Sequence, residues 1–479
     1  MKLRYRFSVR WLAGPTSLLG PMHYYLSFVS AKVFGSYPDK IAYPSLFFSI
    51  LAIPLFFFFL REYFGKKTSL MLTALFSVSY ILVNASRFSS NQNLVPFFVL
   101  IFLWGLLKIM NQPEKFRPGW SIILGIGLGV GIQMHTTCLV AMPLVALLVF
   151  LSLLKKKGQG NLEKLRSRPR YHNCLKCQSI VSELRTNFQN TASFFQGVER
   201  DTDHNPAKSL LYITACQVEA NAHLVASLYD DDDCDDIADF SDDRWATWGA
   251  IILGIASLAF SLLGYYFLVS RFRQETSRER RNFLGLVIVF HAIAFLVLAS
   301  VANYVHVVYF LILFFVPFVL LGILFEFLEK RYGFLGKKIV VAVFILLLAC
   351  SIGRDTAKAI SYSRGMEDND ENSTLAQVEA MSEYLLANVP SGTKEIYFSG
   401  GKDLAQRFSK PIKYFLNQEG IGMTSITTIS RSQLSPDTPL FYISDDLDKI
   451  DKTEGEIISG HEILSKKRFS NQTIFTLKN

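Results

Sequence analysis

The chain has 479 residues, of which 50% are hydrophobic and 19% charged, and its formal net charge at pH 7 is +9. Its mean hydropathy of +0.27 would suit either an apolar soluble protein or a membrane protein, so bulk composition does not fix the class. Most of the excess Lys and Arg stands beside apolar runs, where it orients membrane spans, and this excludes a nucleic-acid partner from our expectations. Six Cys are too few and too scattered for a disulfide scaffold.

Apolar runs long enough to cross a bilayer, which takes about 20 residues, recur along the chain. A tight helical hairpin is expected over Trp120 to Leu154, turning near His135, because this run is too long for one crossing. A further segment, Leu18 to Phe34, reads as a tenth span or as a helix lying in the interface. We therefore predict an α-helical polytopic membrane protein of about 9 to 11 spans. Its clearest runs are Ile41–Leu60, Thr68–Arg87, Leu94–Met110, Thr247–Val269, Phe283–Ser300, Val305–Leu328 and Ile339–Gly353.

Clusters of Lys and Arg between these runs predict which loops are cytoplasmic. The expected extracytoplasmic parts are Ser86 to Pro96, the turn at His135, Asn303 to His306, and everything after Arg354. We expect the protein in the plasma (inner) membrane. The expected cytoplasmic loops contain Arg61–Lys67, Lys108–Arg117, Lys155–Arg170, Arg271–Arg281 and Lys330–Lys338.

The polar interval Asn161 to Arg244 breaks this alternation, because only one clear span separates the basic loops on either side of it. Either Ala207 to Tyr229 crosses despite its Glu219 and His223, or a span has been lost around Arg166 to Val181. We favour the loss. The acidic run Asp230–Asp233 and the pair Cys174 and Cys177 lack the spacing of a calcium loop or of a complete zinc site.

After the last span the pattern changes to alternating helices and strands, which predicts a small extracytoplasmic α/β domain. Helices are expected over Thr374–Val389 and Asp403–Asn417, the second bent or broken by Pro411. Strands are expected at Glu395–Phe398, Thr424–Ile429, Leu440–Ile443 and Thr473–Leu477. The expected division is 1–160 for the N-terminal membrane region, 161–246 for the polar interval, 247–354 for the later spans and 366–479 for the α/β domain.

The N-terminal third carries an ordered set of short motifs. They are Gly14-Pro15-Thr16-Ser17, then Gly20 to Leu26 (GPMHYYL), the basic loop Arg61 to Lys67, and Ser86-Arg87 followed by Asn91 to Pro96 (NQNLVP). Gly131 to Thr136 (GIQMHT) and the stretch from Tyr304 to Pro317 follow later. This order resembles the protein mannosyltransferase-like clan of GT-C glycosyltransferases, including the lipid A aminoarabinose transferase-like enzymes. The resemblance covers Gly14 to Phe150 well and Thr247 to Gly353 loosely.

The resemblance implies transfer of a sugar from a polyprenyl phosphate to an envelope glycan, lipid or protein on the outer face of the membrane. It points to Arg87 for contact with the donor's phosphate and to Asn91 and Asn93 as hydrogen-bond donors. Tyr24, Tyr25 and His23 are expected to line the lipid or sugar path, and His135 to face the pocket. No cofactor is visible in the sequence, although some GT-C enzymes use a divalent metal.

The resemblance also implies an acidic residue ahead of the Gly-Pro segment as general base, and Met1 to Ala13 contains none. Asp39 and Glu183, the nearby outer-side carboxylates, do not match that position. We expect an N-terminally truncated chain, with an inactive relative as the alternative. Two other readings stay open: a non-catalytic membrane partner, and a transporter of lipid-linked substrates, which buried ionisable groups and matched helix breaks would favour.

Overall fold

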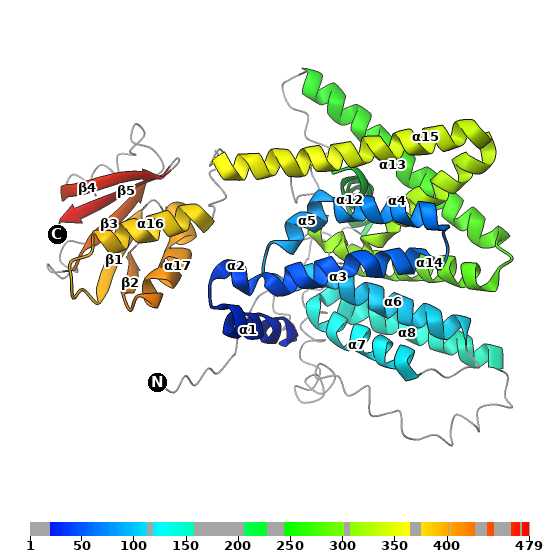
Figure 1. The fold of residues 1–479 in the computed structure, drawn as a ribbon, viewed down its shortest axis with the longest axis horizontal. Coiled ribbons are helices and arrows are strands. Elements are labelled where there is room, and N and C mark those ends of the chain that lie inside the picture. The colour runs from blue at the N-terminus through cyan, green and yellow to red at the C-terminus, as the bar shows by residue number, and fades with distance from the viewer. Residues whose placement is uncertain are drawn as a thin grey trace. The chain divides into compact units, whose positions relative to one another are not determined.

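The structure, a computed structural model, describes residues 20–112, 118–157, 206–227, 244–300, 307–364, 375–400, 402–426, 438–444, 461–469 and 472–478. The chain divides into two compact units, Met1–Asp355 and Thr356–Asn479 (Figure 1). The first is a bundle of helices and the second contains a β-sheet. The motif Gly14–Ser17, the pair Cys174 and Cys177, and the acidic run Asp230–Asp233 lie outside the described residues.

Apolar helices of membrane-spanning length make up most of the first unit. Six helices in the described ranges are long and apolar enough to cross a bilayer, and the bent pair α4 and α5 would add a seventh. This confirms the predicted polytopic α-helical class, whereas the predicted count of 9 to 11 spans is not confirmed. The helices are α1 (Met22–Phe34), α2 (Pro38–Ile41), α3 (Tyr43–Leu60), α4 (Lys66–Ser77), α5 (Tyr80–Ser86), η1 (Asn91–Leu94), α6 (Val95–Asn111), α7 (Pro118–Met134), α8 (Thr136–Lys157), α12 (Pro206–Ala226), α13 (Arg244–Gln274), α14 (Arg278–Ala299), η5 (Val307–Leu313) and α15 (Phe315–Arg364).

Three of these elements refine the predicted spans. The expected hairpin is present, with α7 and α8 separated at His135. Helix α1 has 13 residues, about 20 Å of helix, which is shorter than the hydrocarbon core of a bilayer. Helix α15 runs for 50 residues but contains Gly333 in a non-helical conformation, with φ 53° and ψ −116°. Gly333 therefore separates the two runs that the sequence predicts as different spans, and it supplies a positive φ that other residues adopt at a cost.

Phenylalanine rings fill the centre of the membrane unit. The Phe56 ring centroid lies 4.6 Å from that of Phe76 and 5.6 Å from that of Phe318. A second group joins Phe59 to Phe283 at 5.1 Å between ring centroids. Lipid is as apolar as these rings, so close van der Waals contact rather than exclusion of water holds the helices together here.

Ion pairs identify one end of the bundle, which we call the basic end. Lys108 Nζ lies 2.6 Å from Glu62 Oε1, and this contact joins the end of α6 to the residues after α3. Lys67 Nζ lies 3.5 Å from Glu329 Oε1, so the start of α4 meets the first half of α15. Several of the basic segments predicted as cytoplasmic loops therefore gather at one end. Helices α5 and α7 end at the other, which we call the Arg87 end.

The segment that sequence analysis left open, Ala207 to Tyr229, contains almost all of the helix α12, Pro206–Ala226, most of whose later side chains are buried. Its side chains make a polar network within the bundle: Gln217 Nε2 donates to Asn221 Oδ1 at 2.9 Å, and Asn221 Nδ2 donates to Ser261 Oγ at 3.1 Å. Glu219 is fully buried on the same helix. Buried polar groups are stable only when hydrogen-bonded, so these contacts fix how α12 and α13 pack. The alternative site of a lost span, Arg166 to Val181, lies outside the described residues.

The second unit is a five-stranded mixed sheet with two helices, α16 (Leu375–Ala387) and α17 (Lys402–Gln418). The strand order is β2-β1-β3-β5-β4, with β1 parallel to β2 and β3, and β5 antiparallel to β3 and β4. Pro411 lies inside α17, which continues through it, so of the predicted bend or break, the break is wrong. Sequence analysis missed one strand, β4, because its alternating residues are largely charged and exposed. The strands are β1 (Glu395–Gly400), β2 (Gly422–Ile426), β3 (Leu440–Ser444), β4 (Glu462–Phe469) and β5 (Gln472–Lys478).

Candidate functional site

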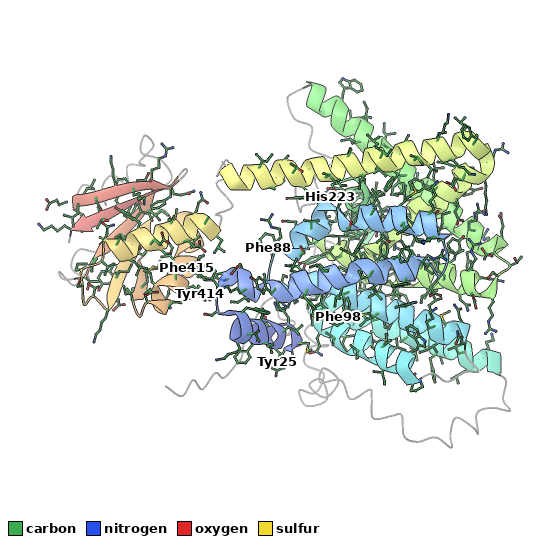
Figure 2. All side chains as sticks on the ribbon, in the orientation of Figure 1. Tyr25, Phe88, Phe98, His223, Tyr414 and Phe415 are labelled. Atoms are coloured by element: carbon green, nitrogen blue, oxygen red, sulfur yellow. The ribbon has the colours of Figure 1, made fainter. Side chains whose placement is uncertain are left out.

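Arg87 lies where a bent helix pair reaches the Arg87 end of the membrane unit. Helices α4 and α5 meet at an angle of 56°, and the chain leaves the second of them at Arg87, whose backbone N donates to Asn84 O at 3.0 Å. The bend is held from outside the pair, because Tyr80 N donates to Ser227 Oγ after α12. The Arg87 side chain is exposed, and so is the ring of Phe88 beside it (Figure 2).

The two predicted amide donors, Asn91 and Asn93, lie on η1, which follows Arg87 in the chain. Both side chains hydrogen-bond to the backbone. Asn91 Nδ2 donates to Met134 O at 2.6 Å, which ties η1 to the end of α7. Asn93 Nδ2 donates to Phe88 O at 2.9 Å and closes the turn between α5 and η1. Each amide nitrogen has a second hydrogen, so both can still donate to a ligand.

His135 is buried in the turn between α7 and α8, one residue after the carbonyl that Asn91 contacts. Its Nδ1 accepts a hydrogen bond from Thr137 N at 3.2 Å, and its ring centroid lies 5.1 Å from that of Tyr309 on η5. Burial lowers the pKa of His135 to about 4, because the charged imidazolium would lose its hydration. His135 is therefore a neutral acceptor in this turn at neutral pH.

Of the three predicted site residues on α1, His23 is buried, whereas Tyr24 and Tyr25 are more accessible. His23 is buried, and its Nδ1 has no hydrogen-bond partner among the described residues. Burial lowers the pKa of His23 as well. Gly20, just ahead of α1, packs directly on the Gln133 side chain at the end of α7, where a Cβ would overlap it. Tyr25 is 53% exposed, at the surface of α1 (Figure 2).

The predicted residues therefore reach the same end of the bundle by two routes. Asn91 contacts the end of α7 directly. Helix α1 packs against α7, and within α1 the rings of His23 and Tyr24 contact each other with their centroids 5.7 Å apart. Tyr25 lies apart from this group. The segment η1 links the two predicted regions, because it follows Arg87 closely in the chain and its Asn91 contacts the residue before His135.

Sequence reasoning missed a polar group in the second half of α15. Arg354 lies over the Tyr80 ring at 5.2 Å, and Asp355 interacts electrostatically with both Arg354 and Arg87. Ser351, one turn earlier, accepts a hydrogen bond at its Oγ from Ser227 Oγ at 3.1 Å. The signal in the sequence was the adjacent Arg and Asp that end the last apolar run, which sequence analysis used only to mark the span boundary.

Of the two carboxylates considered from the sequence, only Asp39 lies among the described residues, and its hydrogen bond is local. Asp39 lies in α2, where its Oδ1 accepts from the neighbouring Lys40 N at 2.7 Å. Glu183 lies outside the described residues. Asp355 is thus a carboxylate that the described fold brings near Arg87. Within the described ranges, no group of three His, Cys, Asp or Glu residues could hold a metal ion.

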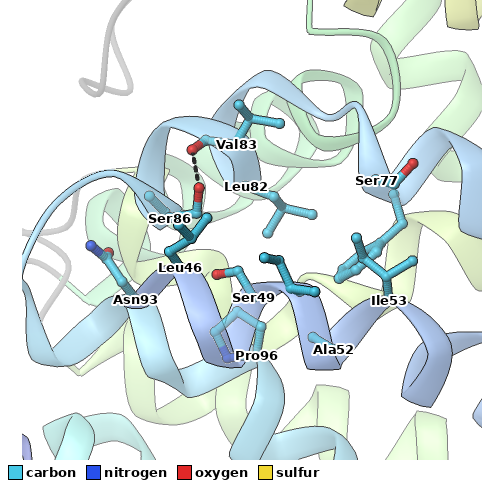
Figure 3. A pocket seen from close by; sticks show the side chains of 13 residues that line it. Leu46, Ser49, Ala52, Ile53, Ser77, Leu82, Val83, Ser86, Asn93 and Pro96 are labelled. Atoms are coloured by element: carbon cyan, nitrogen blue, oxygen red, sulfur yellow. Dashed lines mark hydrogen bonds between the residues drawn. The ribbon is translucent and has the colours of Figure 1, made fainter. Parts of the chain in front are cut away.

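An apolar cavity of about 160 Å³ lies behind Asn93, between α3, the α4–α5 bend and the start of α6 (Figure 3). Its walls are mainly aliphatic, with Leu46, Ile53 and Leu82 among them. Ser86 stands at the same wall, and its hydroxyl donates to Val83 O at 2.6 Å. The cavity therefore has a hydrocarbon-lined interior beside the polar residues at the end of α5.

Comparisons with known proteins agree with the resemblance in the N-terminal third. Residues 18–162 match the family model described as dolichyl-phosphate-mannose-protein mannosyltransferase. The match includes every predicted site residue. No curated protein matches the chain significantly.

Two solved structures are similar to the chain over most of its length. One is ArnT from Cupriavidus metallidurans bound to undecaprenyl phosphate, at 11% identity and a TM-score of 0.48, covering 97% of this chain and 88% of the other. The second is the same protein in the apo state, at 11% identity and a TM-score of 0.49, covering 98% and 89%.

Proposed function

We propose that the protein is a membrane glycosyltransferase that takes a sugar from a polyprenyl-phosphate donor and transfers it to an envelope glycan, lipid or protein. The single observation that carries the proposal is the family match over residues 18–162, which spans the whole Arg87 segment. The geometry supports it, since a cation, two amides and an apolar cavity adjoin one another at the end of α5 and the start of α6.

The donor combines a phosphate with a long hydrocarbon chain, and the site offers a counterpart to each. The Arg87 guanidinium would bind the phosphate, because a charge-assisted hydrogen bond to an oxyanion is about twice as strong as a neutral one. Asn93 would donate its free amide hydrogen, and the cavity behind it would receive part of the chain. His135, neutral in its turn, would contribute a polar wall near Tyr309 without adding charge.

Replacing Arg87 tests the donor site. Arg87→Gln should weaken binding of a polyprenyl phosphate by roughly 10-fold to 100-fold, since a hydrogen bond to a charged group contributes about 1.5–3 kcal/mol. The measurement is transfer of radiolabelled mannose from polyprenyl-phosphate mannose in membranes, beside Kd for the polyprenyl phosphate. Lys32→Gln is the matched control, because it removes one exposed cation from α1. Folded wild-type protein that neither binds the donor nor transfers sugar would contradict the proposal.

We further propose Asp355 as the general base that activates the acceptor. It is a carboxylate that the described fold brings near Arg87. Asp355→Asn should lower the transfer rate by roughly 100-fold or more, as expected for loss of a general base, while donor binding stays intact. Unchanged transfer in this variant would remove Asp355 from the mechanism and leave the donor site standing. Binding without transfer in wild-type protein would favour the non-catalytic partner.

A further inference from the structure

A second and larger cavity lies at the basic end of the membrane unit, away from the Arg87 site. It has a volume of about 820 Å³, measured among the described residues, and is lined by the ends of α6 and α8, the end of α13 and the first three turns of α14. This volume falls within the range of about 300–1,000 Å³ that is usual for small-molecule sites. Nothing in the proposed function uses this cavity.

One face of α14 gives the cavity two chemically different halves. Arg278 and Arg281 lie three residues apart on that face, and Leu286 and Val289 follow on the same side further along the helix. At a rise of 1.5 Å per residue, Arg281 and Val289 are separated by about 12 Å along the axis. Leu148 on α8 faces the apolar half. The cavity is therefore cationic at one end and hydrocarbon-lined at the other.

Among the described residues, no carboxylate forms an ion pair with either of the two cations that line the cavity. The nearby acids instead pair with Arg280, which lies between the two cations in sequence. The Arg280 guanidinium is 3.7 Å from the Glu275 carboxylate and 3.6 Å from that of Glu326. It also lies over the Tyr63 ring, 4.4 Å from the ring centroid. Neither Arg278 nor Arg281 has such an ion pair in the part of the chain that the structure describes. No Asp or Glu is among the described lining residues.

Arg281 is held in place by an aromatic ring rather than by an acid. Its guanidinium lies over Phe272 at 5.5 Å, and Phe272 also lines the cavity. Thr276 and Asn282 add polar groups beside the two arginines, and Asn282 Nδ2 is anchored by donating to Asn111 Oδ1 at 2.8 Å. A planar guanidinium fixed in this way suits two-point recognition of phosphate oxygens.

We propose that this cavity binds an anionic phospholipid, with its phosphate between Arg278 and Arg281 and an acyl chain along Leu148, Leu286 and Val289. The occupant must be both anionic and apolar to match the two halves, and the bilayer around the bundle is the source of such molecules. Basic pockets between membrane helices bind anionic lipid headgroups by this chemistry.

The test is binding of phosphatidylglycerol to the purified full-length protein in a non-ionic detergent, followed by native mass spectrometry. The double variant Arg278→Gln and Arg281→Gln should weaken binding by roughly tenfold or more, because both charge-assisted contacts are lost. The matched control is Lys337→Gln with Lys338→Gln, which removes the same charge from the start of the second half of α15. Phosphatidylcholine should bind weakly to all three proteins.

A further variant separates the two halves of the site. Leu148 is 48% exposed, so Leu148→Gln should leave the fold intact while weakening binding of phosphatidylglycerol severalfold. An equal loss in the lysine control would overturn the proposal in favour of unspecific attraction to the basic end. If inorganic phosphate competed with bound phosphatidylglycerol as strongly as free phosphatidylglycerol does, the proposed contact with an acyl chain would be overturned. Tighter binding of a polyprenyl phosphate, lost in the Arg278 and Arg281 variant, would overturn the choice of lipid. Arg87→Gln should leave phosphatidylglycerol binding unchanged, so this result is independent of the proposed function.

Discussion

Protonation of the buried His135 side chain lowers the stability of the folded protein, because burial disfavours the charged imidazolium. Its pKa is about 4 in the folded protein, against an ordinary value of 6.5. Between these two pH values the unfolded chain binds more protons, so folding stability is complete above pH 6.5 and declines as the pH falls towards 4. The difference corresponds to about 3 kcal/mol at most.

We therefore expect His135→Asn to flatten the pH dependence of the apparent Tm between pH 6.5 and 4. The Asn Oδ1 can replace Nδ1 as the acceptor for Thr137 N, so the turn is retained while the titrating group is removed. Thermal unfolding in detergent, followed by tryptophan fluorescence, measures this. An identical decline of Tm in wild type and variant would show that other groups carry the acid sensitivity.

At the scale of a single helix, α7 contains a matched pair of glycines in opposite surroundings. A Cβ on Gly127 would lie 2.7 Å from Phe102 N and 2.9 Å from its Cα, whereas a Cβ on Gly125 would meet nothing within 4 Å. Gly127 thus sets the close approach of α7 to α6, as small residues do between membrane helices.

Gly127→Ala should destabilise the bundle by about 1–3 kcal/mol, because backbone atoms cannot move aside as a flexible side chain can. Gly125→Ala should be neutral or slightly stabilising, since it gains helix propensity without a clash. Thermal unfolding of the two variants in the same detergent gives the comparison. Equal Tm values would mean that α6 and α7 do not pack at the distance described.

Across the whole molecule, the open question of topology is which side of the membrane each part faces. The predicted arrangement places the basic end in the cytoplasm and the sheet unit outside it. Cysteines introduced at Lys337 and Lys466, both exposed, should then react with an impermeant maleimide from opposite sides of the membrane. Intact cells should label only Lys466→Cys, and inverted vesicles only Lys337→Cys, with the parent chain as background. Labelling of both from one side would contradict the sidedness rule for this chain.

The length of one apolar run predicted the α7–α8 hairpin. Hydrophobic periodicity predicted most of the sheet unit, because regular spacing directly reflects which face is buried. It missed β4, whose charged residues at Lys466 and Lys467 are exposed at the sheet edge. It also left α12 unresolved, since the polar groups of this helix are satisfied by distant residues such as Ser261. Candidate site residues came from a resemblance, and their positions around the end of α7 required the three-dimensional packing. Asp355 could not be found without it, because it is separated from Arg87 by 268 residues of sequence.

The buried network of α12 has a consequence for how the chain enters the membrane during synthesis. Within the helix, Asn221 accepts from Gln217, but its own amide donates to Ser261 and Tyr265 on α13, and Ser227 donates to Ser351 on α15. When α12 leaves the ribosome, the partners on α13 and α15 have not yet been made, and an amide hydrogen without a partner is costly in lipid. The hydrogen bonds that complete this network therefore form only after α13 and α15 have been synthesised.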